Sequence, residues 1–211
     1  MQMISGYYAE QLVFLDETRR DGDAIRRRYG RALPGITPMA VNVPGMGKAA
    51  SILALCGMTG FLAWDVIEGG YNADAFLAVF EHKLCPLLQP FPDAGSVLVL
   101  DNCSIHHAVA ARMEVLVAAR GAKIVWLPAY SPDFTPIEAM FSELKAWFRR
   151  YFRWVASNLE NGRAVELAMR SCVNVTKAVA HYEHAGYRAS PEFMRMVLVP
   201  LMKQELAAAR L

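Results

Sequence analysis

The sequence contains few cysteines, and their spacing excludes the common sites that are built from this residue. The four thiols, Cys56, Cys85, Cys103 and Cys172, include no C-x-x-C pair. A zinc ribbon needs such pairs, and a disulfide scaffold needs a short chain that is dense in cysteine. We therefore expect four reduced and mostly buried thiols in a reducing compartment of the cell.

Long apolar runs and an excess of charge of one sign are also missing. Runs such as 97–100 are far shorter than the ~18 apolar residues of a membrane-spanning helix, and no basic residues precede the short apolar run near the N-terminus. We expect a protein that is not secreted and lies in the nucleus of a eukaryotic cell, or otherwise in the cytoplasm. The 22 basic and 20 acidic residues give a net charge of +2, so a surface for nucleic acid must come from local clustering.

The chain does have enough apolar material for a sizeable core. Its 211 residues are 55% hydrophobic and 20% charged, which excludes a disordered or collagen-like protein. The length predicts one domain with an appendage. We place the domain at residues 1–158 and a helical extension, packed on it, at 159–211.

The hydrophobic pattern predicts several strands first and then an alternation of strands and helices. Strands are predicted over 11–15, 49–55, 61–67, 96–100 and 123–127, the second and third as an antiparallel pair. Helices are predicted over 72–88, with Pro86 ending or bending the helix, over 105–120, from Pro136 to about 152, and as two more segments that break around 186–191. The continuous apolar run at 96–100 is typical of a strand covered on both faces. This order predicts an α/β fold, a mixed sheet flanked by helices with a C-terminal helical tail.

Three acids stand out by their positions. Asp16 and Asp101 each end a predicted buried strand, and Glu138 lies in the first turn of a predicted helix. Strand ends form the rim of a sheet, where ligands of α/β folds usually bind. Three carboxylates that converge there need a cation to stay ionised, and a pair of Mg²⁺ ions suits both oxygen ligands and phosphodiester chemistry.

Each acid also has a purely structural explanation. The residues Thr135-Pro136-Ile137-Glu138 form a good capping box, in which Thr135 caps the helix and Glu138 reaches back. Asp101 could begin a turn and cap the next helix, and Asp16 could form an exposed pair with Glu17. Taken one at a time, the residues leave these alternatives open.

The motifs around the acids, taken in order, resemble one family. DNCSIHH at 101–107, LPAYSPDFTPIE at 127–138 and FSELKAWFRR at 141–150 resemble the catalytic domain of Tc1/mariner and bacterial IS630-like transposases. FLDET at 14–18 is similar to the segment with the first acid of that family, and HAGY at 184–187 is similar to its C-terminal motif. The resemblance covers about residues 10–188.

The resemblance implies a ribonuclease H-like fold with a DDE triad of Asp16, Asp101 and Glu138. These residues would be catalytic and would bind two Mg²⁺ ions, for which Mn²⁺ can substitute, without a small-molecule cofactor. The implied activity is a DNA endonuclease and strand transferase that nicks DNA with water and then joins the freed 3′-hydroxyl to target DNA. The implied partners are DNA, as transposon ends and as target, and a second copy in an active homodimer; no membrane partner is implied.

The sequence departs from the family pattern at two loop positions and at the N-terminus. Ala129 stands where proline is common, and Thr135 where asparagine is common, although threonine is still an N-cap residue. Relatives carry helix-turn-helix DNA-binding domains ahead of the first acid, whereas 15 residues precede Asp16. We therefore expect a catalytic domain alone, from a truncated, decayed or separately encoded transposase.

Supporting residues are predicted around the acids and in two basic stretches. We expect Asn102 to orient Asp101 and His106 to hydrogen-bond the site or the scissile phosphate. Residues with a predicted role in holding DNA phosphates are Arg19, Arg20, Arg26 and Arg27 in the arginine-rich turn after the first strand, and Lys145, Arg149 and Arg153 along one helix face. A solvated charged face with local salt bridges explains either stretch as well, and His181 has no evident partner.

Two further hypotheses compete with an active enzyme. A decayed or domesticated module would keep the fold and a DNA-binding or assembly role without catalysis. The presence of all three acids favours intact chemistry, whereas the expected lack of a DNA-recognition region favours loss of transposition. A ribonuclease H or a junction resolvase would share the metal chemistry, but the Pro-Ile-Glu loop argues against both.

Overall fold

The computed structural model describes most of the chain. The described residues are Ile4, 6–20, 31–37, 49–102, 104–128, 134–158 and 161–209. Three of the four cysteines lie in these ranges, and Cys56, Cys85 and Cys172 are free and buried, as the sequence predicted. Within the same ranges, every helix falls short of the length and hydropathy that a membrane-spanning segment requires.

Five strands form one sheet in the described part of the chain. They are β1 (Leu12–Arg20), β2 (Ala50–Gly57), β3 (Gly60–Glu68), β4 (Val97–Leu100) and β5 (Lys123–Trp126). Their order across the sheet is β3-β2-β1-β4-β5. The pairs β1–β2 and β2–β3 are antiparallel, whereas β1–β4 and β4–β5 are parallel. The predicted mixed sheet and the predicted hairpin between its second and third strands are confirmed.

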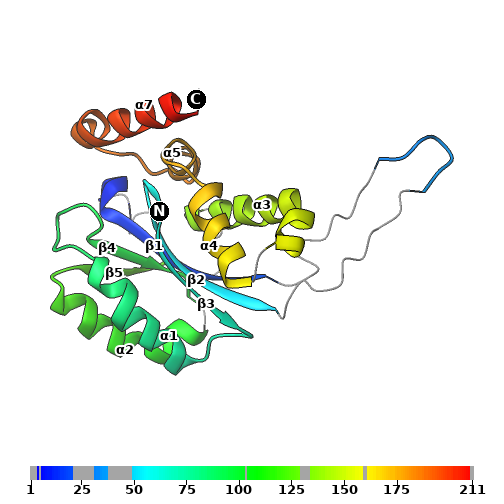
Figure 1. The fold of residues 1–211 in the computed structure, drawn as a ribbon. Coiled ribbons are helices and arrows are strands. Elements are labelled where there is room, and N and C mark those ends of the chain that lie inside the picture. The colour runs from blue at the N-terminus through cyan, green and yellow to red at the C-terminus, as the bar shows by residue number, and fades with distance from the viewer. Residues whose placement is uncertain are drawn as a thin grey trace.

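Helices precede, connect and follow these strands. The short or irregular ones are η1 (Ala9–Gln11), η2 (Phe80–Leu84), η3 (Cys85–Leu87), α6 (Pro191–Phe193) and η5 (Met194–Leu198). The regular ones are α1 (Ala73–Val79), α2 (Ser104–Ala119), α3 (Pro136–Asn158), α4 (Asn161–Cys172), α5 (Val175–His184) and α7 (Val199–Ala208). Figure 1 shows α1 and α2 on one face of the sheet and α3, α4 and α5 on the other.

The continuous apolar run of β4 contributes to the core on both faces of the sheet. Val97 and Val99 pack in the core under α3, α4 and α5, whereas Leu98 and Leu100 pack in the core with α1 and α2. All four side chains are buried. Burying each one stabilises the fold by about 1.5–3 kcal/mol, so a polar residue at any of these positions would be costly. The prediction that both faces of this strand are covered is confirmed.

Two predicted boundaries are wrong, and both errors have a physical cause. The first strand does not end at Asp16 but continues to Arg20, because β2 supplies antiparallel partners for Asp16 through Arg20. The helix predicted over 72–88 begins as expected, with the Asn72 side chain accepting from the Ala75 N–H at 2.8 Å. It then changes to a π-helical turn, η2, and a 3₁₀ turn, η3, that contains Pro86. Pairing and turn type depend on distant neighbours, which the local pattern does not contain.

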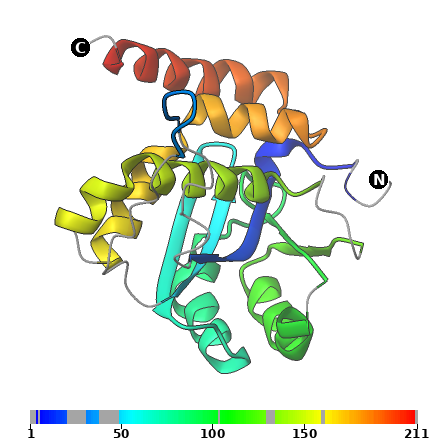
Figure 2. The same cartoon turned by 90° about the vertical axis from the view of Figure 1, so that its right-hand side faces the viewer.

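The C-terminal region contains three helical stretches instead of the predicted two. The first two are α4 and α5, and the third is the continuous stretch of α6, η5 and α7. The predicted break around 186–191 is present. Figure 2 shows α7 lying across α5 as the layer farthest from the sheet. Glu205 of α7 joins the two, because its Oε1 accepts from the Val175 N–H at 2.6 Å, at the start of α5.

The end of α5 depends on a glycine in a left-handed conformation. Gly186 has φ = +89°. Its N–H donates to the Glu183 carbonyl, and the Tyr187 N–H donates to the Tyr182 carbonyl at 2.9 Å. These two bonds form a Schellman motif, which satisfies carbonyls at the helix end and fixes the direction in which the chain leaves. Glycine is the residue that adopts this φ without strain.

We predict that Gly186→Ala lowers the free energy of unfolding by about 1 kcal/mol, because alanine is strained at this φ. The cost is purely conformational, since no described atom lies within 4 Å of the position that a Cβ would take. Gly162→Ala is the matched control: its Cβ would also meet no described atom, but Gly162 lies in α4 without a positive φ and should be neutral or stabilising. Equal changes in both variants, measured by urea denaturation, would contradict the argument.

Candidate active site

The parallel pairing of β1 and β4 brings two predicted site residues together. Leu15 pairs with Leu100 at the last position of this register. Asp16 and Asp101 follow directly, so the chain places two carboxylates side by side on neighbouring strands. Phe14 lies in the core under α3 whereas Leu15 lies in the core with α1 and α2, so alternation along the strand directs Asp16 toward α3.

Asp16 has strongly perturbed acid–base chemistry. Burial, with smaller contributions from the negative charges of Glu138 and Asp101, raises its pKa from 3.8 to about 7. A hydrogen bond from the Glu17 N–H to Asp16 Oδ1, 2.7 Å long, acts in the opposite direction, as does positive charge on His106. The three predicted acids therefore lie within electrostatic reach of one another.

Asp101 is held by a buried histidine from α2. His106 Nδ1 lies 2.7 Å from Asp101 Oδ1 and 3.3 Å from the Asp101 carbonyl oxygen. The His106 side chain is 2% exposed, whereas that of Asp101 is 45% exposed. The ring of His106 also packs against Phe76, with 4.9 Å between ring centroids. A fixed imidazole thus orients a carboxylate that reaches the surface, while Asn102 beside it is exposed.

Glu138 comes from a separate element that is anchored on the sheet. It is the third residue of α3, and its N–H donates to the Thr135 carbonyl at 3.1 Å. The apolar face of α3 is buried through Ile137, Phe141 and Leu144, whereas Glu138 itself is exposed. Its position agrees with both the capping and the catalytic explanation. Its negative charge also helps to raise the pKa of Asp16, so Glu138 lies within electrostatic reach of that residue.

The donor set of this site suits a hard divalent cation. All three groups are carboxylates, the ligands that Mg²⁺ prefers, and their mutual repulsion helps to raise the pKa of Asp16. In the ranges that the structure describes, no three His, Cys, Asp or Glu side chains lie close enough to enclose a metal ion. The three carboxylates nevertheless suit a divalent cation by their chemistry and their charge.

The predicted DNA-contacting residues are distributed unevenly. Arg19 is exposed, but Arg20 is 4% exposed, and its guanidinium lies 5.4 Å from the centre of the Phe148 ring. Burial lowers the pKa of Arg20. The prediction of a phosphate contact is therefore wrong for Arg20 in this conformation, because its side chain packs under α3.

The remaining basic residues belong to α3 or to parts that are not described. Lys145 and Arg149 lie on α3 and are partly exposed. Arg153 lies on the same helix, but its side chain is outside the described residues, as are Arg26, Arg27 and the loop at 129–133. Their roles stay predictions.

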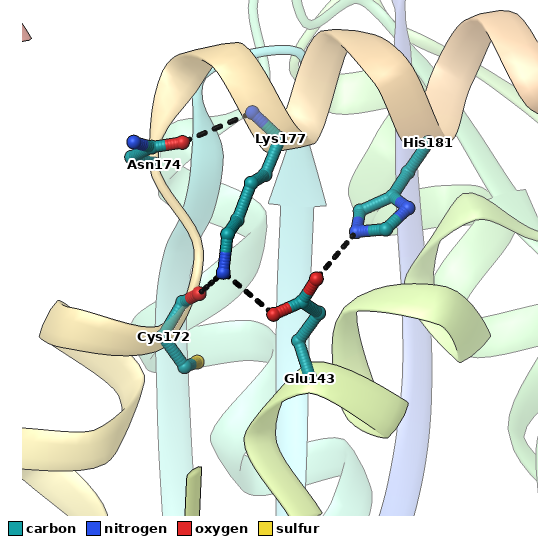
Figure 3. Close-up of polar contacts among 5 residues, drawn as sticks. All are labelled: Glu143, Cys172, Asn174, Lys177 and His181. Carbon is teal, nitrogen blue, oxygen red and sulfur yellow. Dashed lines mark hydrogen bonds and ion pairs between the residues drawn. The ribbon is translucent and has the colours of Figure 1, made fainter. Parts of the chain in front are cut away.

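One polar cluster was not found by the sequence analysis. Glu143 of α3 accepts from Lys177 Nζ of α5 at 2.6 Å and lies 3.9 Å from His181 Nε2. Lys177 also donates to the Cys172 carbonyl, as Figure 3 shows. The sequence offered no evident partner for His181, and the structure places Glu143 near its ring but beyond hydrogen-bond distance. Glu143 and Lys177 are 34 positions apart, and no local pattern links them.

A comparison with protein families now identifies the class of this protein. The chain belongs to the DDE superfamily endonuclease family, whose model matches residues 11–158. The match includes Asp16, Asp101 and Glu138, and it confirms the family that the motifs indicated. No curated protein matches the chain.

Three solved structures are similar to this chain. A chain of the simian T-cell lymphotropic virus intasome, in complex with PP2A regulatory subunit B56 gamma, has a TM-score of 0.52 and 11% identity over 78% of this chain and 48% of that one. The Mos1 strand transfer complex has a TM-score of 0.47 and 16% identity over 82% of this chain and 55% of that one. The catalytic domain of Mos1 mariner transposase has a TM-score of 0.39 and 12% identity, covering 87% and 86%.

The intasome likeness and the sheet order together show a ribonuclease H-like fold, as predicted. This chain spans about half the length of the Mos1 chain in the strand transfer complex, since 55% of that chain is covered.

We predict that Asp16→Asn stabilises the metal-free protein at high pH. The folded-state pKa of about 7 lies above the unfolded value of 3.8, so wild-type stability falls as the pH rises through this window. Asparagine carries no charge and keeps an oxygen for the Glu17 N–H. The variant should gain about 2 kcal/mol at pH 8, less at pH 5, and nothing near pH 4, measured by thermal melting.

An exposed carboxylate provides the comparison for this pH series. Asp93 lies in the turn before β4, and Asp93→Asn should not reproduce the pH-dependent gain. A wild-type melting temperature that rises between pH 5 and pH 8, in parallel with that of Asp16→Asn, would show that Asp16 is not a buried, protonatable group.

Proposed function

We propose that this chain is the catalytic domain of a Tc1/mariner-type transposase, a metal-dependent DNA endonuclease and strand transferase. The observation that carries the proposal is that three carboxylates from three separate parts of the chain lie within electrostatic reach of one another. The register of β1 and β4 sets Asp16 beside Asp101, and the charge of Glu138 acts on Asp16 from α3. Membership of the DDE superfamily endonuclease family and the order of the motifs support the same activity.

The carboxylates of Asp16, Asp101 and Glu138 would hold two Mg²⁺ or Mn²⁺ ions. Bound there, such ions would neutralise the developing phosphate charge and favour deprotonation of an attacking water or 3′-hydroxyl. Asp16 contributes a buried carboxylate whose raised pKa makes it a strong ligand once a cation displaces its proton. His106 keeps Asp101 in a single orientation, so little ordering is needed when the ligands close. No protein nucleophile is required.

The substrate and the partners follow from this chemistry. DNA, as transposon ends and as target, would be the substrate, and Arg19, Lys145 and Arg149 are the described basic residues that would contact its backbone. We propose that the active form is a homodimer, in the nucleus of a eukaryotic cell or otherwise in the cytoplasm. A non-catalytic DNA-binding module of the same origin is the alternative that the experiment below separates.

The proposed function predicts metal binding and DNA cleavage by the wild-type protein. Wild type should bind Mn²⁺ in a calorimetric titration and nick supercoiled plasmid DNA. Glu138→Gln and Asp101→Asn should remain folded but lose both properties, because each removes one charged ligand. Glutamine still serves a capping box, so Glu138→Gln removes the ligand and keeps the cap.

The control is Glu114→Gln, which changes an exposed carboxylate in the middle of α2 that takes no part in the proposed site. It should keep most of the Mn²⁺ affinity. If wild type and all variants bind metal and nick DNA alike, or if none does so, the carboxylates are structural and the non-catalytic alternative is preferred. Cleavage of an RNA–DNA hybrid in preference to duplex DNA would instead indicate a ribonuclease H.

A further prediction concerns the basic face of α3. Lys145→Gln and Arg149→Gln should each weaken binding to a fluorescent DNA duplex, without regard to its sequence, and reduce the slope of log K against log salt by about 1. Arg170→Gln is the control, because Arg170 is bound to Glu166 on α4 through Nε and Nη2. An unchanged slope for both α3 variants would assign these residues to a solvated surface.

A further inference from the structure

A tyrosine after α5 is bonded to the chain just before the helix that carries Glu138. The Tyr187 hydroxyl donates to the Phe134 carbonyl at 2.8 Å. Phe134 lies two residues before Pro136, the first residue of α3. Burial raises the pKa of Tyr187 to about 12, so the hydroxyl keeps its proton in any ordinary assay buffer. The bond therefore fixes the chain at the point where it enters α3.

A second contact from α5 holds the same helix on the other side of Glu138. Lys177 Nζ donates to Glu143 Oε2 at 2.6 Å and to the Cys172 carbonyl at 3.0 Å (Figure 3). The side chain of Lys177 is thus shared between α3 and the end of α4. Glu138 lies between the two attachment points, four residues after Phe134 and five before Glu143.

The segment that provides both contacts is itself fixed to the strand of Asp16. Tyr182 is fully buried, and its hydroxyl lies 3.1 Å from the Leu12 carbonyl and 3.4 Å from that of Cys56. Phe14, two residues before Asp16, packs against the rings of both Tyr182 and Tyr187, with 5.5 Å between centroids in each case. One rigid segment therefore contacts β1 and both sides of Glu138.

We propose that Tyr187 is a positioning residue for Glu138. Its hydroxyl, supported by Lys177, sets where the first turn of α3 lies relative to β1, and so sets the position of the third carboxylate relative to Asp16. Tyr187 touches neither substrate nor metal in this proposal. The inference rests on the proposed function, because it assigns Glu138 a role at the site.

The backbone turn before Tyr187 fits this role. The Schellman motif at Gly186 places residue 187 against the last turn of α5, where its ring packs on Tyr182 with 6.1 Å between centroids. The glycine permits the turn, and the tyrosine carries a hydroxyl from that turn to Phe134. The Gly-Tyr pair of the HAGY motif thus receives a physical explanation that does not require contact with DNA.

Tyr187→Phe tests the proposal, since it removes the hydroxyl and keeps the ring. We expect kcat for plasmid nicking to fall roughly tenfold, as small misplacements of catalytic groups do, with KM for DNA unchanged. Mn²⁺ titration should show weaker binding by a similar factor. Without metal, amide hydrogen exchange should become faster over 137–141 and stay unchanged in β4. Lys177→Gln should accelerate exchange over the same residues.

Tyr71→Phe is the matched control. The Tyr71 hydroxyl lies 2.9 Å from Asp65 Oδ2, and Tyr71 packs in the core on the opposite face of the sheet. This variant should leave kcat, Mn²⁺ affinity and exchange over 137–141 unchanged. If Tyr187→Phe lowers the melting temperature but retains wild-type kcat and Mn²⁺ affinity, Tyr187 is merely structural and the proposal is overturned.

If the proposed function is wrong, the results would differ from those expected if only the role of Tyr187 is wrong. In that case wild type and Glu138→Gln would bind Mn²⁺ and nick DNA equally, or neither would do so. The exchange measurement would still report whether the Tyr187–Phe134 hydrogen bond holds the first turn of α3, because it needs no metal and no DNA. Unchanged exchange over 137–141 in Tyr187→Phe would then refute the positioning role independently.

Discussion

Burial of one carboxylate close to two others, at the end of a buried parallel strand pair, is the constraint on which this site depends. The register of β1 and β4 leaves Asp16 and Asp101 side by side, at the edge of two fully buried apolar runs. Burial and two neighbouring carboxylates raise the pKa of Asp16 to about 7. A protein keeps such an arrangement at a cost in stability, so the arrangement needs a compensating role. Binding a divalent cation would both relieve the repulsion and use the charge.

The fold was largely predictable from local patterns, because apolar runs and turn residues determine where most elements lie. The five strands, the two faces of β4 and the start of α3 at Pro136 all follow from such patterns. The end of β1 was not predictable in this way. Asp16 through Arg20 are mostly polar and resemble the end of a strand, but they belong to β1 because β2 pairs with them. The burial of Arg20 under Phe148 was not predicted, for the same reason. A charged side chain is expected to be exposed unless a residue distant in the sequence covers it.

Part of the candidate site could likewise be predicted from the sequence, and part could not. The three acids were found because motif order and strand ends are visible in the sequence, and His106 because it follows Asp101 closely. The contacts that hold α3 were not found, since they join residues 34 and 53 positions apart through single hydrogen bonds. The HAGY motif was noted as a pattern, but its connection to Phe134 exists only in the folded chain. Sequence patterns thus identified the three candidate acids better than the contacts that hold them in place.

The core under α3 crosses the boundary at which the family match ends. The match stops at residue 158, but Ala164, Ala168, Val179 and Tyr182 are buried in one cluster with Phe14, Ile52 and Phe141. A fragment cut at that boundary would keep α3 but lose the later helices, and it would expose the apolar surface that they cover, including the ring of Phe14. Truncating a buried aromatic residue alone commonly costs about 3–5 kcal/mol, against a total of about 5–15 for a domain. The recognisable motif region and the unit that folds are therefore of different lengths in this protein.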